Sequence, residues 1–355
     1  IPVLDTIMLT AETNRIILTV NNLISSLIVD VDGEVIEPGN ILIDKSNFKL
    51  IKKLSGVLNI TDEVESITEE LKEYTVTIKA NRNLKFNSLD PDGFPEVETG
   101  INEEAFIMPE NVFKDKLKIK AFVAKNHFRQ VFNNILISAK NDMVACNTHY
   151  LAKYKMNVEN KCEKDMIIPV QSVEELNKIL DNKSTNDLRF FYNITSNDEP
   201  EYLKIVGKGF TYITRLIEGI YPDYEQVIPQ SFCTTLNIKN KKLQDSLEFV
   251  LEIVKDNKSK PIVFSITDQF KVYTIEDDKN MSEILLGDIT GKELAVSFNA
   301  GYVNDILKTI SEDKVSIKIS GRTSPAMFQG ENNDDEMYVL VPLRLKEDEC
   351  EDVAV

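Results

Sequence analysis

The sequence predicts an α+β fold in which three similar domains follow one another along the chain. One pattern occurs three times, an apolar strand followed by a polar joint and an amphipathic helix, in Ile41–Leu54, Met166–Leu180 and Leu294–Ile310. The apolar faces of these helices begin at Phe48, Val173 and Val303, so the repeats are 125 and 130 residues apart. A repeat of this length is a domain and not a solenoid unit, and 355 residues are enough for two or three domains.

Helix signals support each repeat. The three joints carry residues that can cap a helix, Ser46, Ser172 and Asn299. The second and third repeats each have an earlier helix, which we expect over about Asn111–Ala124 and over Lys242–Lys255. The same spacing in the first repeat leads to a position before residue 1, so we expect the first domain to lack its opening helix.

The chain between the helices is typical of antiparallel strands joined by turns. We expect strands over Tyr74–Lys79, Tyr202–Val206, Pro261–Ile266 and Val315–Ile319. Asp32-Gly33 and Asp92-Gly93 are turn signals. These elements predict domains at residues 1–99 (its N-terminal part missing), 103–229 and 230–346, followed by an acidic tail at 347–355.

Composition excludes several classes of protein. The formal charge is −17, from 41 basic and 58 acidic residues, and 42% of the residues are hydrophobic, as in a globular protein. No apolar run reaches the roughly 18 residues of a membrane span, and the sequence contains no charged-then-apolar signal pattern, so export is not expected. The four cysteines are scattered without a C-x-x-C pair, which indicates reduced thiols in the cytoplasm: Cys146, Cys162, Cys233 and Cys350.

Motifs that could carry chemistry are incomplete. Asp30–Gly33 resembles the start of a calcium loop but lacks the later acidic ligands, and Gly287–Lys292 is one residue short of a phosphate loop. We interpret both as turns. Cys146 and His149 lie three residues apart, and we favour a structural role over a catalytic thiolate pair. We therefore expect no enzyme activity, no metal and no cofactor; a hydrolase or thiol enzyme around these two residues is the alternative.

Lysines gather on the expected helices of an otherwise acidic chain. A solvated helix face is the ordinary explanation. The sharper hypothesis is a basic surface that contacts the phosphates of DNA, without aromatic side chains to stack on single-stranded bases. The lysines expected to face DNA are Lys45, Lys49, Lys52, Lys53, Lys114, Lys118, Lys125 and Lys242.

Three segments resemble the bacterial sliding clamp family, the β subunit of DNA polymerase III. They are Arg215–Pro229 (RLIEGIYPDYEQVIP), Phe298–Leu307 (FNAGYVNDIL) and Tyr338–Leu345 (YVLVPLRL). The resemblance implies the DNA clamp fold: antiparallel sheets form the outer wall of a ring, and helices line the hole. It also implies a head-to-tail homodimer around duplex DNA in the cytoplasm, at the nucleoid and without membrane contact. The implied partners are the polymerase III α subunit, the clamp loader, repair polymerases and mismatch-repair proteins.

The same resemblance implies a groove for Gln/Leu/Phe-rich partner peptides. Tyr150 stands where the family commonly has Arg, Thr148 where Gly is usual, and Gln226 where a basic residue is frequent. The matching dimer-interface positions are Phe86, Ile253 and Val254. A repeat-domain peptide-binding protein that does not encircle DNA is the alternative. The matching groove positions are Phe132, Cys146, Thr148, His149, Tyr150, Leu151, Pro222, Gln226, Val227, Asn299, Tyr302, Thr323, Pro325, Val339, Leu340, Val341, Pro342, Leu343 and Arg344.

Overall fold

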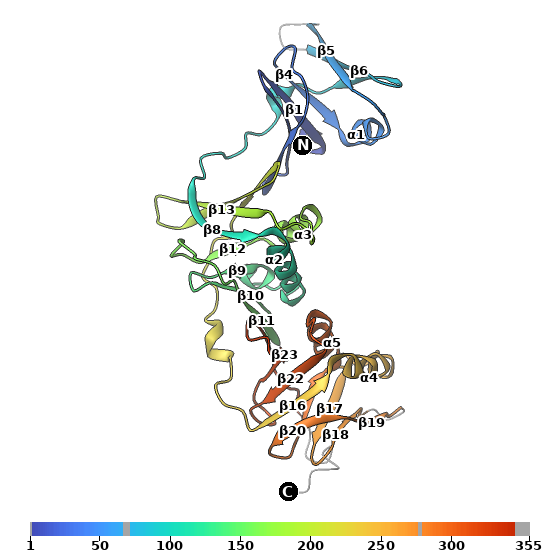
Figure 1. Cartoon of the computed structure of the whole chain (residues 1–355), viewed down its shortest axis with the longest axis vertical. Coiled ribbons are helices and arrows are strands. Elements are labelled where there is room, and N and C mark those ends of the chain that lie inside the picture. Colours follow the sequence, from blue (N-terminus) through green and yellow to red (C-terminus); the bar gives the residue numbers. More distant parts are fainter. Residues whose placement is uncertain (1, 67–71, 276–278, 345–355) are drawn as a thin grey trace. The chain divides into compact units, whose positions relative to one another are not determined.

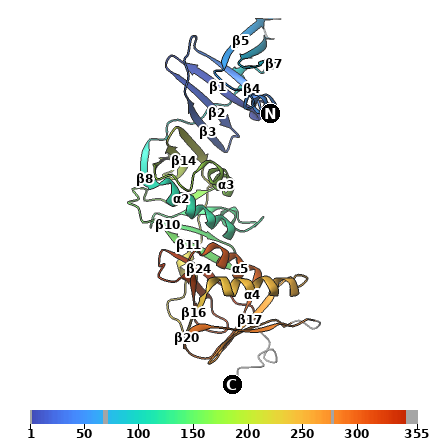
Figure 2. The ribbon, with the colours of Figure 1, turned by 45° about the vertical axis from the view of Figure 1, so that its right-hand side comes forward.

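The computed structural model describes residues 2–66, 72–275 and 279–344 (Figures 1 and 2). The chain divides into two units, each with its own sheets. Unit 1 consists of Ile1–Asn111, Asn160–Cys162 and Asp181–Leu216. Unit 2 consists of Val112–Glu159, Glu163–Leu180 and Ile217–Val355. The acidic tail and Cys350 lie outside the described residues.

Unit 1 contains an eight-stranded and a three-stranded sheet, in which all neighbouring strands are antiparallel. The larger sheet has the order β4-β1-β2-β3-β15-β14-β13-β8, and the smaller has the order β5-β6-β7. The strands are β1 Thr6–Glu12, β2 Arg15–Asn21, β3 Ser25–Val31, β4 Gly39–Asp44, β5 Asn59–Ser66, β6 Lys72–Lys79, β7 Asn83–Ser88, β8 Glu103–Pro109, β13 Asp187–Ile194, β14 Pro200–Gly207 and β15 Phe210–Arg215.

The helix of unit 1 is α1, Lys45–Ile51, whose buried face packs on both sheets. Ile51 lies in one apolar cluster with Ile41 and Ile43 of β4 and with Val76 and Ile78 of β6. The prediction that Ser46 caps this helix is wrong. Asp44 is the N-cap, and its carboxylate accepts hydrogen bonds from the main-chain nitrogens of Ser46 and Asn47, each 2.8 Å long. Asp was overlooked because it closes the preceding strand, although Asp caps helices as well as Ser does.

Unit 2 contains a nine-stranded and a four-stranded antiparallel sheet. Their orders are β12-β9-β10-β11-β24-β23-β22-β16-β20 and β19-β18-β17-β21. The strands are β9 Ile135–Ile137, β10 Asp142–Cys146, β11 Tyr150–Lys155, β12 Met166–Ile168, β16 Thr234–Lys239, β17 Pro261–Ile266, β18 Phe270–Tyr273, β19 Ser282–Leu285, β20 Gly287–Gly291, β21 Leu294–Asn299, β22 Lys314–Ile319, β23 Ala326–Gly330 and β24 Glu336–Leu340.

The helices confirm the repeat but correct two of its details. α4 (Asn240–Ile253) and α5 (Ala300–Thr309) pack against each other in unit 2 (Figures 1 and 2), and Asn299 caps α5 as expected. In α3 (Val170–Ile179) the expected cap Ser172 is wrong, because Ser172 lies buried inside the first turn and Pro169 is the N-cap. The helix expected over Asn111–Ala124 is α2, Glu110–Lys116, continued by a 3₁₀ helix over Leu117–Phe122.

Two expected turns are wrong. Asp32-Gly33 does not join a hairpin, because β3 pairs with β2 and β15 while β4 pairs with β1. Gly287–Gly291 is the edge strand β20, paired with β16. Gly291 has φ +110°, and a Cβ there would collide with the carbonyl oxygen of Cys233. The glycines therefore allow close strand approach rather than a phosphate loop.

Candidate functional site

A groove of about 500 Å³ lies in unit 2, and its walls come from five segments. These are the 3₁₀ helix Gln130–Asn133, the turn between β10 and β11, the joint at residues 222–231, the turn between β22 and β23, and the end of β24. Twelve residues expected from the resemblance line it: Phe132, Cys146, Thr148, His149, Tyr150, Leu151, Pro222, Gln226, Val227, Pro325, Val339 and Val341.

The floor of the groove is apolar because neighbouring strands turn alternate side chains to it. β11 pairs with β24, with Leu151 opposite Val339, and both side chains are almost fully buried. They belong to a cluster that also contains Cys146, Tyr221 and Tyr224. Phe132 packs against the same cluster. Such a floor suits apolar anchor residues of a bound segment.

Cys146 is a structural residue of this floor. Its Sγ lies 3.4 Å from the hydroxyl oxygen of Tyr221. Burial raises the pKa of the Cys146 thiol, and the hydrogen bond with the Tyr221 hydroxyl offsets only part of this effect. A thiol kept protonated is a poor nucleophile. His149 contacts the ring of Tyr302 instead, and the geometry gives no support to the thiol-enzyme alternative.

One wall is a stack of aromatic rings held by a rigid turn. The side-chain oxygen of Asn147 accepts hydrogen bonds from the main-chain nitrogens of His149 (2.7 Å) and Tyr150 (3.0 Å). The ring of Tyr150 stacks on Tyr302 at 4.6 Å between centroids, and its hydroxyl donates to the carbonyl oxygen of Ala121 at 3.0 Å. Burial raises the pKa of Tyr150, so its side chain contributes no charge to this wall.

The joint forms another wall. A hydrogen bond and an ion pair at Asp142 of β10 hold it against the sheet. The hydroxyl of Tyr224 donates to the carboxylate of Asp142 at 3.0 Å, and Lys153 forms an ion pair with the same carboxylate at 2.9 Å. Asp223 caps the 3₁₀ turn Tyr224–Val227, and its carboxylate also accepts a hydrogen bond from the amide of Gln226 at 3.0 Å.

Seven expected residues do not line the groove. Tyr302 stacks on the wall residue Tyr150 but does not itself line the groove. Asn299 caps α5. Leu340 is fully buried, because strand alternation turns it away from the face of Val339 and Val341. The remaining four follow β24 or lie in the turn before β23: Thr323, Pro342, Leu343 and Arg344.

Nine lining residues were missed by the sequence analysis. Several of them directly adjoin expected positions in the joint, which could have been taken as one continuous segment. The others belong to turns whose place depends on how the sheet strands associate. The nine are Asn147, Asp223, Tyr224, Ile228, Pro229, Gln230, Ser231, Ser320 and Ser324.

The lysines expected to face DNA differ in their surroundings. The four lysines in and after α1 are exposed, as are Lys125 and Lys242. Lys114 donates a hydrogen bond to the carbonyl oxygen of Asn177. Lys118 forms ion pairs of 3.3 Å with Asp115 and with Glu336.

The expected interface residues are only partly accessible. Phe86 packs against the α1 cluster in unit 1 and is half-buried. Ile253 is half-buried, whereas Val254 is 1% exposed and its side chain offers no surface to a partner. Phe249, one turn before Ile253 on α4, is 62% exposed.

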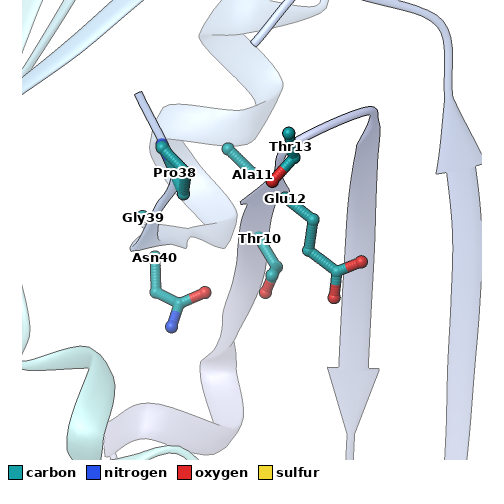
Figure 3. A pocket seen from close by; sticks show the side chains of 7 residues that line it. All are labelled: Thr10, Ala11, Glu12, Thr13, Pro38, Gly39 and Asn40. Atoms are coloured by element: carbon teal, nitrogen blue, oxygen red, sulfur yellow. The ribbon is translucent and has the colours of Figure 1, made fainter. Parts of the chain in front are cut away.

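Among the described residues, no group of three or more His, Cys, Asp and Glu side chains could hold a metal ion. A shallow, open cavity of about 450 Å³ lies between the end of β1 and the start of β4 (Figure 3). Glu12 is its one charged lining residue, beside Thr10, Thr13 and Asn40. No helix in the described ranges is both long and apolar enough to cross a membrane.

Comparison with known proteins identifies the family. The model of the DNA polymerase III beta subunit central domain matches residues 108–223, and that of its C-terminal domain matches residues 225–344. The beta sliding clamp of Staphylococcus epidermidis is 26% identical over 366 residues, covering 97% of this chain and 92% of the relative. That of Staphylococcus aureus is 26% identical over 367 residues with the same coverage.

Solved structures share the fold. The DNA polymerase III subunit beta of Pseudomonas aeruginosa has a TM-score of 0.85 at 22% identity, covering 97% of this chain and 94% of the other. The DNA polymerase sliding clamp of Bacillus subtilis has a TM-score of 0.82 at 21% identity, covering 98% and 93%. Since the two family models together span well over half of its residues, the chain belongs to the family of the DNA polymerase III beta subunit, the sliding clamps, which are non-catalytic processivity factors of DNA replication.

Proposed function

We propose that two copies of this chain close head to tail into a ring around duplex DNA and tether the replicative polymerase to it. Each copy contributes three similar domains, at residues 1–99, 103–229 and 230–346. The family membership and the threefold repeat of strand and helix support this proposal. The ring acts in the cytoplasm, at the nucleoid.

The proposed DNA face is made of exposed lysines. Lys45, Lys49, Lys52 and Lys53 provide mobile positive charges in a chain of net charge −17. Contacts between lysine and phosphate carry no sequence information and are weakened by salt, so a ring that holds DNA in this way can slide. Lys125 and Lys242 belong to the same face in this proposal.

We place the polymerase contact in the groove. The groove is the observation on which the proposed function depends most. An apolar floor framed by polar edges fits short segments with Leu and Phe anchors. We assign to it the polymerase III α subunit, the clamp loader, repair polymerases and mismatch-repair proteins. The ring itself closes through the surfaces around Phe86 of one copy and Ile253 and Phe249 of the other.

Retention on DNA tests encirclement. The protein is loaded onto a nicked circular plasmid and separated from free protein by gel filtration, before and after one restriction cut. A ring stays on the circle and leaves the linear DNA, because it slides off the ends. Equal retention on both forms would contradict encirclement and favour a non-encircling peptide-binding protein.

A substitution in the groove tests the polymerase contact. Val341 is 45% exposed and lines the groove, so Val341→Asp adds a charge to the apolar floor. We expect the affinity for a Gln/Leu/Phe-rich peptide, measured by calorimetry, to fall at least about tenfold. Ile36→Asp, at a 90% exposed loop position of unit 1, is the matched control and is expected to bind normally. Equal affinities would refute the groove assignment.

A further inference from the structure

The groove carries one formal charge, and that charge is negative. Among its lining residues, all of which the structure describes, Asp223 is the one acidic side chain, and no lysine or arginine is present. The other polar lining groups are amides, hydroxyls and one imidazole: Asn147, Thr148, His149, Tyr150, Tyr224, Gln226, Gln230, Ser231, Ser320 and Ser324.

Two positions that could hold cations are filled by neutral side chains with local partners. The hydroxyl of Tyr150 donates to the carbonyl oxygen of Ala121 at 3.0 Å, and its ring is fixed against Tyr302. The amide of Gln226 donates to Asp223 at 3.0 Å. Neither side chain can therefore form an ion pair with an acidic residue of a bound segment.

The carboxylate of Asp223 retains capacity for a further donor. It accepts one hydrogen bond from the main-chain nitrogen of Glu225 and one from the amide of Gln226. A carboxylate can accept about four hydrogen bonds. Asp223 is also exposed, so an incoming ammonium or guanidinium group can reach it.

Three cations beside the groove-lining residues have other close partners. Lys140 forms an ion pair of 2.9 Å with Glu225, and its charge also interacts with that of Asp223. The guanidinium of Arg129 lies over the ring of Phe132, 5.5 Å from its centre. Lys153, below the joint, is paired with Asp142. None of the three faces the carboxylate of Asp223 through an observed hydrogen bond or ion pair.

Building on the function proposed above, we propose that this groove selects partner segments that carry Lys or Arg beside their apolar anchors, and disfavours segments that carry Asp or Glu there. Asp223 provides the direct contact. The net charge of −17 acts in the same direction over longer distances, because it attracts basic segments and repels acidic ones.

Three peptides test this selectivity. They share one Gln/Leu/Phe-rich core and differ at a single flanking residue, which is Lys, Gln or Asp. Dissociation constants are measured by fluorescence anisotropy at low salt and about pH 8, where an ordinary imidazole is neutral. We expect the Lys peptide to bind about fivefold more tightly than the Asp peptide, with the Gln peptide between them. The ratio should fall toward 1 as salt is raised.

Variants assign the preference to one side chain. Asp223→Asn removes the charge while keeping a residue that caps the 3₁₀ turn equally well, and the Asp-to-Lys ratio of dissociation constants should fall to about 1–2. Gln226→Lys places a cation beside the carboxylate, which offsets its negative charge, and should likewise bring the ratio toward 1. Asp268→Asn, in the turn between β17 and β18, changes net charge equally outside the groove and should keep the ratio.

The outcomes separate this inference from the function on which it rests. If no peptide binds, the groove assignment itself fails. If all three peptides bind equally at low salt, or if Asp223→Asn keeps the original ratio, the groove binds peptides but the proposed selectivity is wrong.

Discussion

Two lysine-rich segments of the chain look alike in sequence and differ in what their lysines contact. Those in and after α1, Lys45, Lys49, Lys52 and Lys53, are exposed and form no ion pair with any residue that the structure describes. In the segment over α2 and the following 3₁₀ helix, Lys114 and Lys118 are engaged and Lys116 is buried.

The difference has a physical cause in the neighbouring elements. β24 places the buried Glu336 beside the second segment, where it pairs with Lys118 and accepts a hydrogen bond from the hydroxyl of Tyr338 at 3.2 Å. Burial lowers the pKa of Lys116, and the nearby carboxylates of Glu336, Asp335 and Asp115 offset this only in part. A cluster of lysines in a sequence therefore predicts where positive charge lies, but not whether that charge is free to meet a phosphate.

The largest effect is expected in DNA binding by the α1 segment. Replacing Lys45, Lys49, Lys52 and Lys53 by Gln should weaken binding to a duplex on the order of 100-fold at low salt. It should also lower the slope of log K against log salt by about 3, because up to four phosphate contacts are lost. Fluorescence anisotropy over a salt series measures both quantities.

The second segment provides the control for that experiment. Replacing Lys114 and Lys118 by Gln should change the slope by less than about 1, because their charges already have partners in the protein. If both sets of substitutions lower the slope equally per lysine, the contrast between the segments is wrong.

The next effect is on stability and concerns the partner of Lys118. Glu336→Ala leaves Lys116 and Lys118 beside a vacated anion site, and should lower the free energy of unfolding by about 2 kcal/mol. Asp115→Ala removes the other carboxylate, which is 65% exposed, and should cost less than about 0.5 kcal/mol. Urea unfolding followed by circular dichroism compares the two, and equal losses would show that Glu336 is an ordinary surface charge.

The smallest expected effect is the loss of stability when the N-cap of α1 is removed. Asp44→Ala should cost about 1 kcal/mol of stability, since two main-chain nitrogens lose their acceptor. Burial raises the pKa of Asp44, but hydrogen bonds from Ser46 and Asn47 outweigh it and lower the pKa below 3.8. Its contribution is therefore present above about pH 4 and lost as the pH falls through the lowered value.

Asp44→Asn is the matched variant for this measurement. It retains the cap without the titrating carboxylate, so its stability should not show the additional loss below pH 4 that the parent protein shows. A parent and an Asn variant with the same acid unfolding curve would contradict the role given to the charge.

The fold could be predicted where local signals and tertiary packing agree. The strand that became β17 was predicted with its correct bounds, and Asn299 caps α5 because it directly precedes the apolar helix face. The local sequence signals were misleading where tertiary contacts determine the secondary structure. Gly287–Gly291 has the composition of a turn, but pairing with β16 makes it a strand. Ser172 has the chemistry of a cap but lies inside the helix.

The groove could be predicted from the resemblance in its continuous segments and not beyond them. Positions 146–151 and the joint carry most of the expected residues that line the groove, because contiguous residues stay close in space. Ser320 and Ser324 were missed, since only sheet association brings their turn to the joint. Leu340 was expected at the groove but is buried, because period-two alternation gives it the opposite face to Val339 and Val341.

The pairing of β11 with β24 fixes the spacing of the residues on the groove floor. The floor residues Leu151 and Val339 sit on adjacent strands joined by main-chain hydrogen bonds, so the width there is fixed by backbone geometry. The floor belongs to a nine-stranded sheet, which holds both strands in place. A segment that binds in the proposed groove must therefore fit its anchor residues to this fixed spacing.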